Sequence, residues 1–302
     1  MQSPQVQTPS RFEAVKTTFV CGGVTCAATL RLPESRDGKP LPAILMVHGW
    51  GGVQNALTPP FYDRFTGAGF AVMTFDYRGW GDSAGMPRNQ INPKQRVLDA
   101  DAALAHLKSL PQIDADRIVL WGSSFGGGHV VELAAEHPEL LGAIAQVPML
   151  NGMAAVRAVP LFTLLRFALY ALADLLKPGR PIYLPVVSAP GEFGSMDRDD
   201  AQRALFAGMA AIGRPYDNRV AARSLMTMGP YRPFKRLKDI RVPTLIVGGT
   251  RDSVAPFNEA DIVAAGNDRI RVRSIDANHF EPYFEPTFST SIAHQLSFLA
   301  SL

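Results

Sequence analysis

A glycine-rich segment, Gly122-Ser123-Ser124-Phe125-Gly126, directly follows a short apolar run at 117–121. Glycine weakens a strand unless the backbone must turn sharply or approach another group closely. The spacing fits G-x-S-x-G, the pattern of a nucleophile elbow, in which a strand turns abruptly into a helix and exposes the central serine. Ser124 is therefore the candidate nucleophile of an acyl-transfer reaction.

Two other glycine-rich motifs do not fit this segment. A phosphate-binding P-loop needs Lys and then Ser or Thr after its last glycine, whereas His129 and Val130 follow here. A dinucleotide fingerprint that starts at Gly126 needs a glycine where Val131 stands. Because G-x-S-x-G also arises by chance, the functional interpretation depends on partners for Ser124.

A serine hydroxyl needs a general base, and the base needs an acid that orients it. Behind an elbow of this type the chain order is Ser, then Asp or Glu, then His. His279 follows a predicted strand, whereas His294 lies inside the last predicted helix. Asp252 follows the preceding predicted strand, at 244–247. We therefore predict the triad Ser124, Asp252 and His279.

An acyl-transfer site also needs two donors for the oxyanion. The backbone N–H of Phe125, next to the nucleophile, is the first, and the second is expected from the loop after the strand at 43–47. That loop is His48-Gly49-Trp50-Gly51-Gly52, and we predict the N–H of Trp50 as its donor. His48 is expected to order the loop rather than to act as a base.

Other polar residues are assigned to structure. Glu281 is too close in sequence to His279 to be the first choice of acid. Asp76, near Arg78, is interpreted as part of a structural ion pair. Glu132 follows His129, but no zinc-binding motif is completed, so the sequence predicts no metal site.

The elements that must position these residues alternate regularly. Continuous apolar strands alternating with amphipathic helices predict a mostly parallel sheet covered on both faces, with an antiparallel hairpin at one edge. The predicted strands are 14–21, 24–32, 43–47, 70–75, 117–121, 144–147, 244–247 and 270–275, and the predicted helices are 59–68, 94–109, 125–137, 257–265 and 287–301.

One long interval interrupts the alternation. About 90 residues separate the strand ending near 148 from the strand opening at 242, whereas a helical crossover unit needs only about 30. The interval predicts helices at 155–176 and 198–212, the second entered through a capping region at 195–197. We therefore divide the chain into an α/β core, 1–148 and 237–302, and a helical cap, 149–236, inserted between strands 6 and 7.

Composition limits the class of protein. The chain has 302 residues, of which 47% are hydrophobic and 19% charged, so it can bury a large core. A net charge of +3 without a basic helix face argues against a nucleic-acid partner. No secretory signal or apolar run long enough to span a bilayer is visible. Cys21 and Cys26 are interpreted as free thiols of a cytoplasmic protein.

Several segments together resemble the α/β-hydrolase superfamily over nearly the whole chain. They are similar to the branch that holds dienelactone-hydrolase-like esterases, X-Pro dipeptidyl-peptidase-like acyl hydrolases and fungal polyketide transferases. The segments are 48–52, 76–83, 121–127, 189–192 and 231–233, with Asp252 and 279–283. The resemblance implies the triad Ser124, Asp252 and His279, an oxyanion hole at Trp50 and Phe125, and no metal or organic cofactor.

The sequence thus predicts a serine esterase acting on a small acyl ester. A thioesterase or polyketide acyltransferase with the same triad is the alternative, and a non-catalytic binding protein is a third possibility. Apolar residues surround the helix predicted at 155–176, so we expect apolar contacts on both of its faces. Phe162 and Phe167 are predicted to line an acyl pocket, with packing of the helix inside the cap or a homodimer contact as the alternatives.

Overall fold

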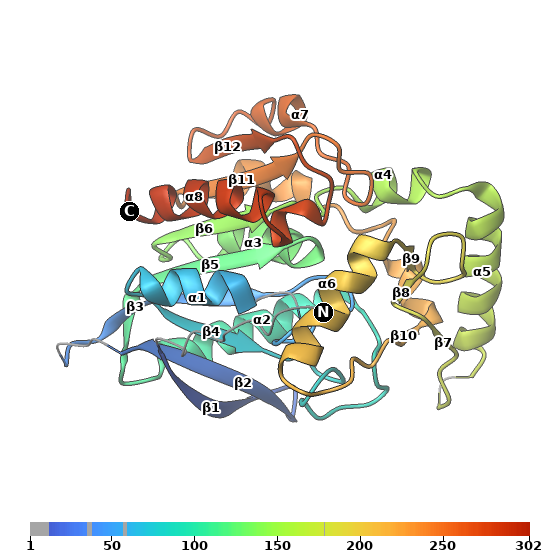
Figure 1. Cartoon of the computed structure of the whole chain (residues 1–302), viewed down its shortest axis with the longest axis horizontal. Helices are drawn as coiled ribbons and strands as arrows, with labels where there is room; N and C mark the ends of the chain where they lie inside the picture. The colour runs from blue at the N-terminus through green and yellow to red at the C-terminus, as the bar shows by residue number, and fades with distance from the viewer. Residues whose placement is uncertain (1–11, 35–37, 57–58, 178) are drawn as a thin grey trace, which may run out of the picture.

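The computed structural model describes residues 12–34, 38–56, 59–177 and 179–302. Its centre is an eight-stranded sheet (Figure 1) with the order β1-β2-β4-β3-β5-β6-β11-β12. The strands are β1 (Phe12–Cys21), β2 (Val24–Pro33), β3 (Leu41–Val47), β4 (Ala71–Phe75), β5 (Ile113–Ser123), β6 (Gly142–Gln146), β11 (Thr244–Gly249) and β12 (Ile270–Ile275). Strands β4 to β12 of this order pair in parallel, and β2 pairs antiparallel with both β1 and β4. The predicted mostly parallel sheet is therefore confirmed.

The burial of the strands explains their sequences. All residues of β4 and β6 are buried, because helices cover both faces of the central sheet. The edge strand β1 is mostly exposed and instead alternates in sequence. It turns into β2 through Gly22 and Gly23, whose φ angles of 55° and 75° suit a tight hairpin turn.

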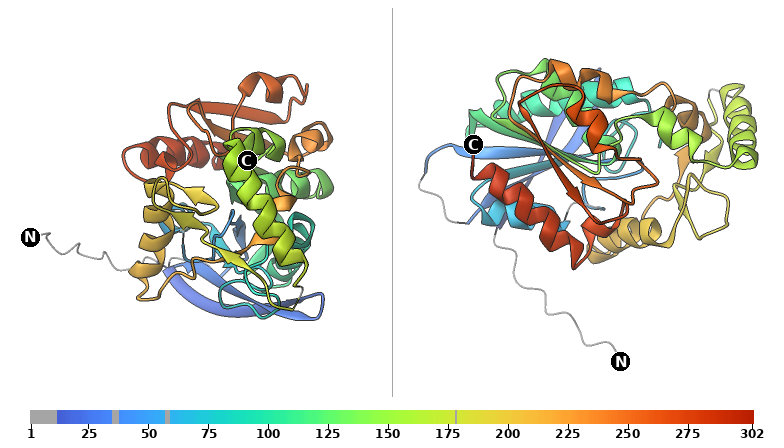
Figure 2. Two further views of the ribbon diagram at one scale, coloured as in Figure 1. Left: turned by 90° about the vertical axis from the view of Figure 1, so that its right-hand side faces the viewer. Right: turned by 90° about the horizontal axis from the view of Figure 1, so that it is seen from above.

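Four long helices form the two outer layers. Helices α1 (Pro59–Gly67) and α8 (Thr287–Leu299) contact each other on one face, and α2 (Pro93–Lys108) and α3 (Phe125–Glu136) contact each other on the opposite face (Figure 2). The short helix α7 (Glu259–Val263) packs beside β12.

The strand order reverses direction at β3. Strand β4 pairs with one edge of β3 and β5 pairs with the other, so the loops after β3 and β5 diverge at this point. Open parallel sheets bind ligands at such a switch point, beyond the carboxyl ends of the strands. The loop at 48–52 and the turn at 122–126 both lie there.

The segment between β6 and β11 extends beyond the sheet (Figure 1, right-hand side). Its elements are α4 (Gly152–Arg157), α5 (Leu161–Leu175), β7 (Tyr183–Leu184), β8 (Val187–Ser188), β9 (Met196–Asp197), α6 (Asp199–Ala211), β10 (Val220–Ala221) and the 3₁₀ helices η1 (Ala222–Thr227) and η2 (Pro233–Asp239). A further 3₁₀ turn, η3 (Glu281–Tyr283), precedes α8.

Two predictions for this segment were wrong in detail. The helix predicted at 155–176 is split into α4 and α5, because Pro160 stands at the start of α5 and cannot continue a preceding helix. The capping region predicted at 195–197 contains β9 instead, and Arg198 is the residue that precedes α6.

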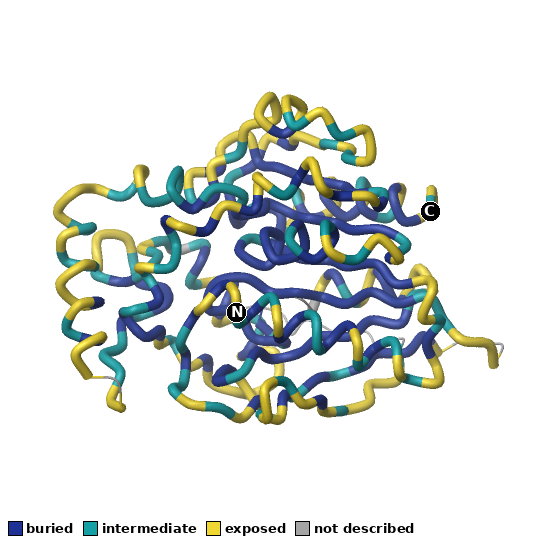
Figure 3. The backbone as a smooth tube through the Cα atoms, turned by 180° about the vertical axis from the view of Figure 1, so that it is seen from behind, coloured by how far each residue is buried: buried dark blue, intermediate teal, exposed yellow. Residues whose placement is uncertain are grey.

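One side of α5 is exposed (Figure 3). We call this side the α5 outer face and define it by five residues spaced three and four apart: Phe162, Leu165, Leu169, Leu172 and Leu176. Their exposed fractions lie between 57% and 76%. Apolar contacts were expected on both faces of this helix, but within the described chain only the opposite face, which includes the buried Ala171 and Asp174, is covered.

Candidate active site

Ser124 occupies a sharp turn between β5 and α3. Its φ of 58° and ψ of −125° lie in a region that residues with side chains rarely adopt. The flanking glycines make this turn possible: a Cβ on Gly122 would lie 2.4 Å from the Gly126 carbonyl oxygen, and one on Gly126 would lie 2.1 Å from the Val47 carbonyl oxygen. The structure therefore gives Ser124 the backbone of a nucleophile elbow, as the glycine spacing predicted.

Three polar side chains form a hydrogen-bonded row at this turn. The Nδ1 atom of His279 lies 2.6 Å from Asp252 Oδ2, and its Nε2 atom lies 2.8 Å from Ser124 Oγ. Because a carboxylate only accepts hydrogen bonds, Nδ1 carries the proton and Nε2 accepts from the serine hydroxyl. Asp252 and His279 are buried, whereas Ser124 is half-buried. The three predicted residues are thus brought together.

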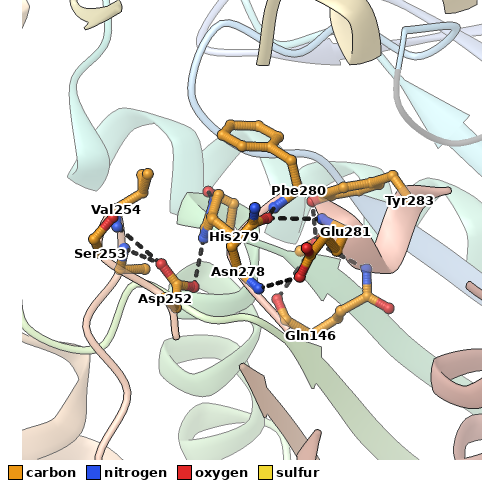
Figure 4. A network of polar contacts seen from close by, with 12 residues as sticks. Gln146, Asp252, Ser253, Val254, Asn278, His279, Phe280, Glu281 and Tyr283 are labelled. Atoms are coloured by element: carbon orange, nitrogen blue, oxygen red, sulfur yellow. Dashed lines mark hydrogen bonds and ion pairs between the residues drawn. The ribbon is translucent and has the colours of Figure 1, made fainter. Parts of the chain in front are cut away.

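Backbone donors hold the acid of this row. Asp252 Oδ1 accepts from the amides of Val254, at 2.9 Å, and Ala255, at 2.8 Å (Figure 4). Its second oxygen is then left for His279 alone. Asp252 follows β11 and His279 follows β12, and since these strands are parallel, both loops emerge at the edge of the sheet that carries Ser124.

The loop that carries His279 is fixed by its neighbours. Asn278 Oδ1 accepts from the amides of Phe280, at 2.8 Å, and Glu281, at 3.0 Å, and Glu281 Oε2 accepts from the Asn278 amide at 2.6 Å (Figure 4). Glu281 also pairs with Arg251 at 2.9 Å. The carboxylate that competed for the acid role is therefore engaged in holding the loop.

The two predicted oxyanion donors belong to adjacent segments. A Cβ on Gly49 would lie 3.0 Å from Ser124 Cβ and 3.2 Å from the Phe125 nitrogen, so the loop after β3 approaches the elbow closely. Within the described chain, neither the Trp50 nor the Phe125 amide has a hydrogen-bond acceptor. The Trp50 indole N–H donates to Ser195 Oγ at 3.0 Å, which anchors the loop to the segment between β6 and β11.

Three buried side chains behind this loop were not predicted. The Tyr77 hydroxyl donates to the His48 carbonyl at 3.0 Å, the Tyr216 hydroxyl donates to the Gly51 carbonyl at 2.6 Å, and Arg96 Nη1 donates to the Gly49 carbonyl at 2.9 Å. Arg96 falls on the buried stripe of α2 together with small and apolar residues. A charged residue at a core-facing position was the signal in the sequence that could have identified it.

The buried histidines near the site are structural. His48 Nε2 lies 2.9 Å from the Phe75 carbonyl oxygen, as expected for a residue that orders the loop. Burial, together with the nearby Arg96 charge, lowers the pKa of His48 to about 3. His129 Nδ1 lies 2.7 Å from the Tyr231 hydroxyl, and burial lowers its pKa well below the usual value. Both imidazoles are therefore neutral near pH 7.

Asp76 is structural, but the predicted ion pair was wrong. Its carboxylate accepts from the Gln54 amide at 2.8 Å, the Gln54 side chain at 3.0 Å and the Asp82 amide at 3.0 Å. Arg78 pairs instead with Asp99 of α2. Asp76 therefore fixes the loop after β4 through neutral donors.

The two phenylalanines predicted to bind an acyl group differ in placement. Phe162 is 72% exposed on the α5 outer face. Phe167 is half-buried, and its ring centroid lies 5.4 Å from that of Phe193. Among the described residues, no aromatic contact joins Phe162 or Phe167 to the His279 ring beside Ser124. The role of the two phenylalanines in substrate binding therefore stays a prediction.

The residues that the structure describes contain no cluster of three or more His, Cys, Asp or Glu side chains arranged to hold a metal ion. None of their helices has the length and apolar character needed to cross a membrane. Cys21 and Cys26 are free thiols.

Comparisons with known proteins identify the family and the fold. The family model described as "Serine aminopeptidase, S33" matches residues 38–277. The quorum-quenching protein AidA of Acinetobacter baumannii (strain MDR-ZJ06) is 33% identical over 284 residues, which cover 93% of this chain and 92% of AidA. A thiohydrolase of Eupenicillium brefeldianum is 24% identical over 253 residues, which cover 81% and 79% of the two chains. The crystal structure of the α/β hydrolase GrgF from Penicillium sp. sh18 matches with a TM-score of 0.73 at 23% identity and covers 95% of this chain and 97% of GrgF.

Proposed function

The chain belongs to the serine aminopeptidase S33 family of α/β hydrolases, and we propose that it is a serine hydrolase that cleaves carboxylic esters through an acyl-enzyme. The observation that carries this proposal is the hydrogen-bonded row of Ser124, His279 and Asp252, next to two amides, of Trp50 and Phe125, that have no acceptor among the described residues. A nucleophile, a base, an orienting acid and oxyanion donors within reach of one another are the parts that acyl transfer needs.

Each part has a role in the proposed reaction. Ser124 Oγ attacks the acyl carbon while His279 Nε2 takes its proton, and the negative oxygen that forms is stabilised by the amides of Trp50 and Phe125. The protonated His279 then gives this proton to the departing alcohol, which leaves the acyl group on Ser124. Asp252 holds the imidazole in the required tautomer and stabilises its charged form.

Water completes the proposed cycle. His279 takes a proton from a water molecule, and the resulting hydroxide attacks the acyl-enzyme carbonyl. The second tetrahedral intermediate uses the same two amides. When it collapses, His279 returns the proton to Ser124, which restores the enzyme and releases the carboxylic acid.

A thioesterase or polyketide acyltransferase is the second candidate. It uses the same residues, but the leaving group is a thiol or the acceptor is an alcohol instead of water. The similarity to a protein named as a thiohydrolase favours this candidate. A non-catalytic binding protein on the same fold is the third, because fold alone does not determine function.

An activity screen distinguishes these candidates. Wild-type protein and Ser124→Ala are assayed with p-nitrophenyl esters of increasing acyl length, with acyl thioesters, and with an aminoacyl p-nitroanilide for the activity in the family's name. Ester hydrolysis lost in Ser124→Ala supports the esterase. A higher kcat/KM on thioesters, or an alcohol that outcompetes water, supports the second candidate. Wild-type protein that neither turns over nor is labelled by a fluorophosphonate contradicts both.

We extend the proposal to the segment 149–236, as a cap over the site. The hydrogen bond from Trp50 to Ser195 supports this, because it ties the segment to the oxyanion loop. Of the two phenylalanines, Phe167 is the better candidate for acyl binding, since it faces inward against Phe193. The exposed Phe162 fits a contact outside the site better.

We also propose that the α5 outer face contacts a second copy of this chain. Its spacing of three and four residues is that of a helix that packs lengthwise on another helix. A standard interface takes roughly 800 Å² from each partner, and the exposed apolar side chains of α5 provide an area of that order.

We propose the cytoplasm as the location of the protein, which the two free cysteines support.

A further inference from the structure

Arg96 is a buried cation directly behind the oxyanion loop. Its guanidinium carbon lies 4.4 Å from the ring centroid of Tyr77 and 4.9 Å from that of Trp80. Nη1 donates to the Gly49 carbonyl at 2.9 Å, whereas Nε and Nη2 have no hydrogen-bond partner within the described chain. Asp99, on the same stripe of α2, binds Arg78 instead.

Such an arrangement is unfavourable for folding by itself. Burying a charge without a hydrogen-bonded carboxylate costs free energy, and each unsatisfied buried donor adds to that cost. The contacts with the two rings and the nearby Asp99 carboxylate offset part of it. Burial lowers the pKa of Arg96 to about 10, so the guanidinium still carries its proton at neutral pH. A methionine of similar length would fill the same space between the rings without this cost. The single strong bond that Arg96 makes is therefore the feature to explain.

That bond is made to the peptide unit that bears the predicted oxyanion donor. The Gly49 carbonyl and the Trp50 N–H belong to one planar trans peptide, in which C=O and N–H point in opposite directions. Arg96 therefore holds the carbonyl toward the interior, together with the Gly52 amide, which donates to the same oxygen at 3.2 Å. The N–H of Trp50 is then directed to the other side of this peptide, opposite the Gly49 carbonyl. Gly49 itself lies against Ser124 and Phe125.

The same bond changes the electrical properties of the amide. A hydrogen bond from a cation to a carbonyl is about twice as strong as a neutral one. In a buried site it also polarises the peptide, which makes the N–H at its other end a better donor. Donors that are fixed and polarised before the reaction are those that stabilise an oxyanion most.

We propose that Arg96 is a positioning residue for hydrolysis, which orients and polarises the Trp50 amide through the Gly49 carbonyl. This inference rests on the proposed function and adds a residue that does not touch the substrate. The buried charge of Arg96 is thereby explained by its effect on catalysis and not by a contribution to the stability of the fold. Weakening one oxyanion donor is expected to slow the chemical step without changing how the substrate binds before it.

The test compares Arg96→Met with a matched buried arginine. Arg31 is also buried and lies 3.8 Å from the Tyr62 ring centroid. It donates to Thr74 Oγ1 at 2.8 Å and to Asn55 Oδ1 at 3.4 Å, and neither of these bonds is made to residues 48–52 of the oxyanion loop. For Arg96→Met we expect kcat on a p-nitrophenyl ester to fall by about tenfold or more, a fraction of the loss from deleting a donor outright. We expect KM within about twofold of wild type and an unchanged or raised urea midpoint. Arg31→Met is expected to keep kcat.

The rate of fluorophosphonate labelling of Ser124 separates this proposal from the proposed function. Wild-type protein that is not labelled contradicts the hydrolase itself. Wild-type protein that is labelled, together with Arg96→Met labelled at the same rate, overturns the role of Arg96 alone. A kcat that falls only in proportion to the urea midpoint, or an equal loss in Arg31→Met, also overturns it.

Arg96→Lys keeps the experiment decisive if Arg96→Met does not fold. It retains the charge but shortens the reach and loses the planar fork. A labelling rate between those of wild type and Arg96→Met, or at least about threefold below wild type when only Arg96→Lys folds, supports the proposal. A rate equal to wild type with an equal kcat overturns it.

Discussion

At the scale of single residues, Ser124 holds a backbone conformation that costs free energy. A residue with a side chain at such angles costs on the order of 1–3 kcal/mol, and it persists only where its surroundings fix it. Here the Ser124 amide donates to the Gln146 carbonyl at 2.9 Å, and the amides of Gly127 and Met149 donate to the Ser124 carbonyl. The strained turn is thus held from both sides.

The residues of the proposed triad are expected to act as one unit. Ser124→Ala and His279→Ala are each expected to lower kcat by on the order of a millionfold, and the double variant by scarcely more, since neither group works without the other. Steady-state ester hydrolysis on purified variants measures this. His279→Ala with a tenth of wild-type activity would show that another group is the base.

The sequence was enough to propose these three residues, but not to identify the residues that hold the site in place. Ser124, Asp252 and His279 each follow a predicted strand, and chain order together with the common edge of a parallel sheet brings them together. Arg96 could not be placed in the same way. Its contact with Gly49 depends on how α2 packs behind the loop after β3, and no local pattern encodes that packing.

At the scale of elements, strand length decided what the sequence could predict. The long buried strands β3 and β5 have continuous apolar runs that can be recognised from the sequence. The pairs β7–β10 and β8–β9 have strands of only two residues each, which is too short for any periodicity, so these small sheets were not predicted. They form where the segment between β6 and β11 folds back on itself.

Helix α5 provides a prediction at this scale. Leu165→Glu combined with Leu169→Glu is expected to convert a dimer into a monomer, because it places two charges on the α5 outer face in each copy. Sedimentation velocity at micromolar concentration measures the state, and hydrolysis of a short ester is expected to persist. Leu98→Glu is the control, since Leu98 is a single exposed leucine of α2.

Two outcomes would contradict the dimer. The first is a monomeric wild-type protein over the same concentration range. The second is a monomer that binds vesicles containing anionic lipid, which would assign the α5 outer face to a membrane surface. The exposed cations Arg157 and Lys177 beyond the two ends of α5 make that measurement worthwhile.

At the scale of the whole molecule, the lowered pKa values of the buried His48 and His129 predict that the protein is sensitive to acid. The folded-state pKa values of His48 and His129 lie below the unfolded value of 6.5, so the unfolded chain takes up protons first as the pH falls. The stability that they contribute is complete above pH 6.5 and is lost progressively below it. The expected slope is about 1 kcal/mol per pH unit for each histidine.

Urea unfolding at pH 7.5, 6.5 and 5.5 measures this effect, in a range of about two pH units over which most carboxylates stay ionised. His129→Gln is expected to flatten the slope even if it lowers stability at every pH, because only one of the two histidines remains. A free energy of unfolding that stays constant across this range would contradict the prediction.

The pairing of β6 with β11 has a consequence for how the chain folds. These neighbours in the sheet are separated in sequence by the whole segment that carries α5 and α6, so their contact closes a loop of about 100 residues at an entropic cost of about 4 kcal/mol. Strands β1 to β6, which contain Ser124, close loops of up to about 75 residues without it. Contacts between distant parts of a chain form slowly. The proposed acid and base, Asp252 and His279, lie beyond this closure, so we predict that a refolding chain regains activity only after β11 has paired with β6.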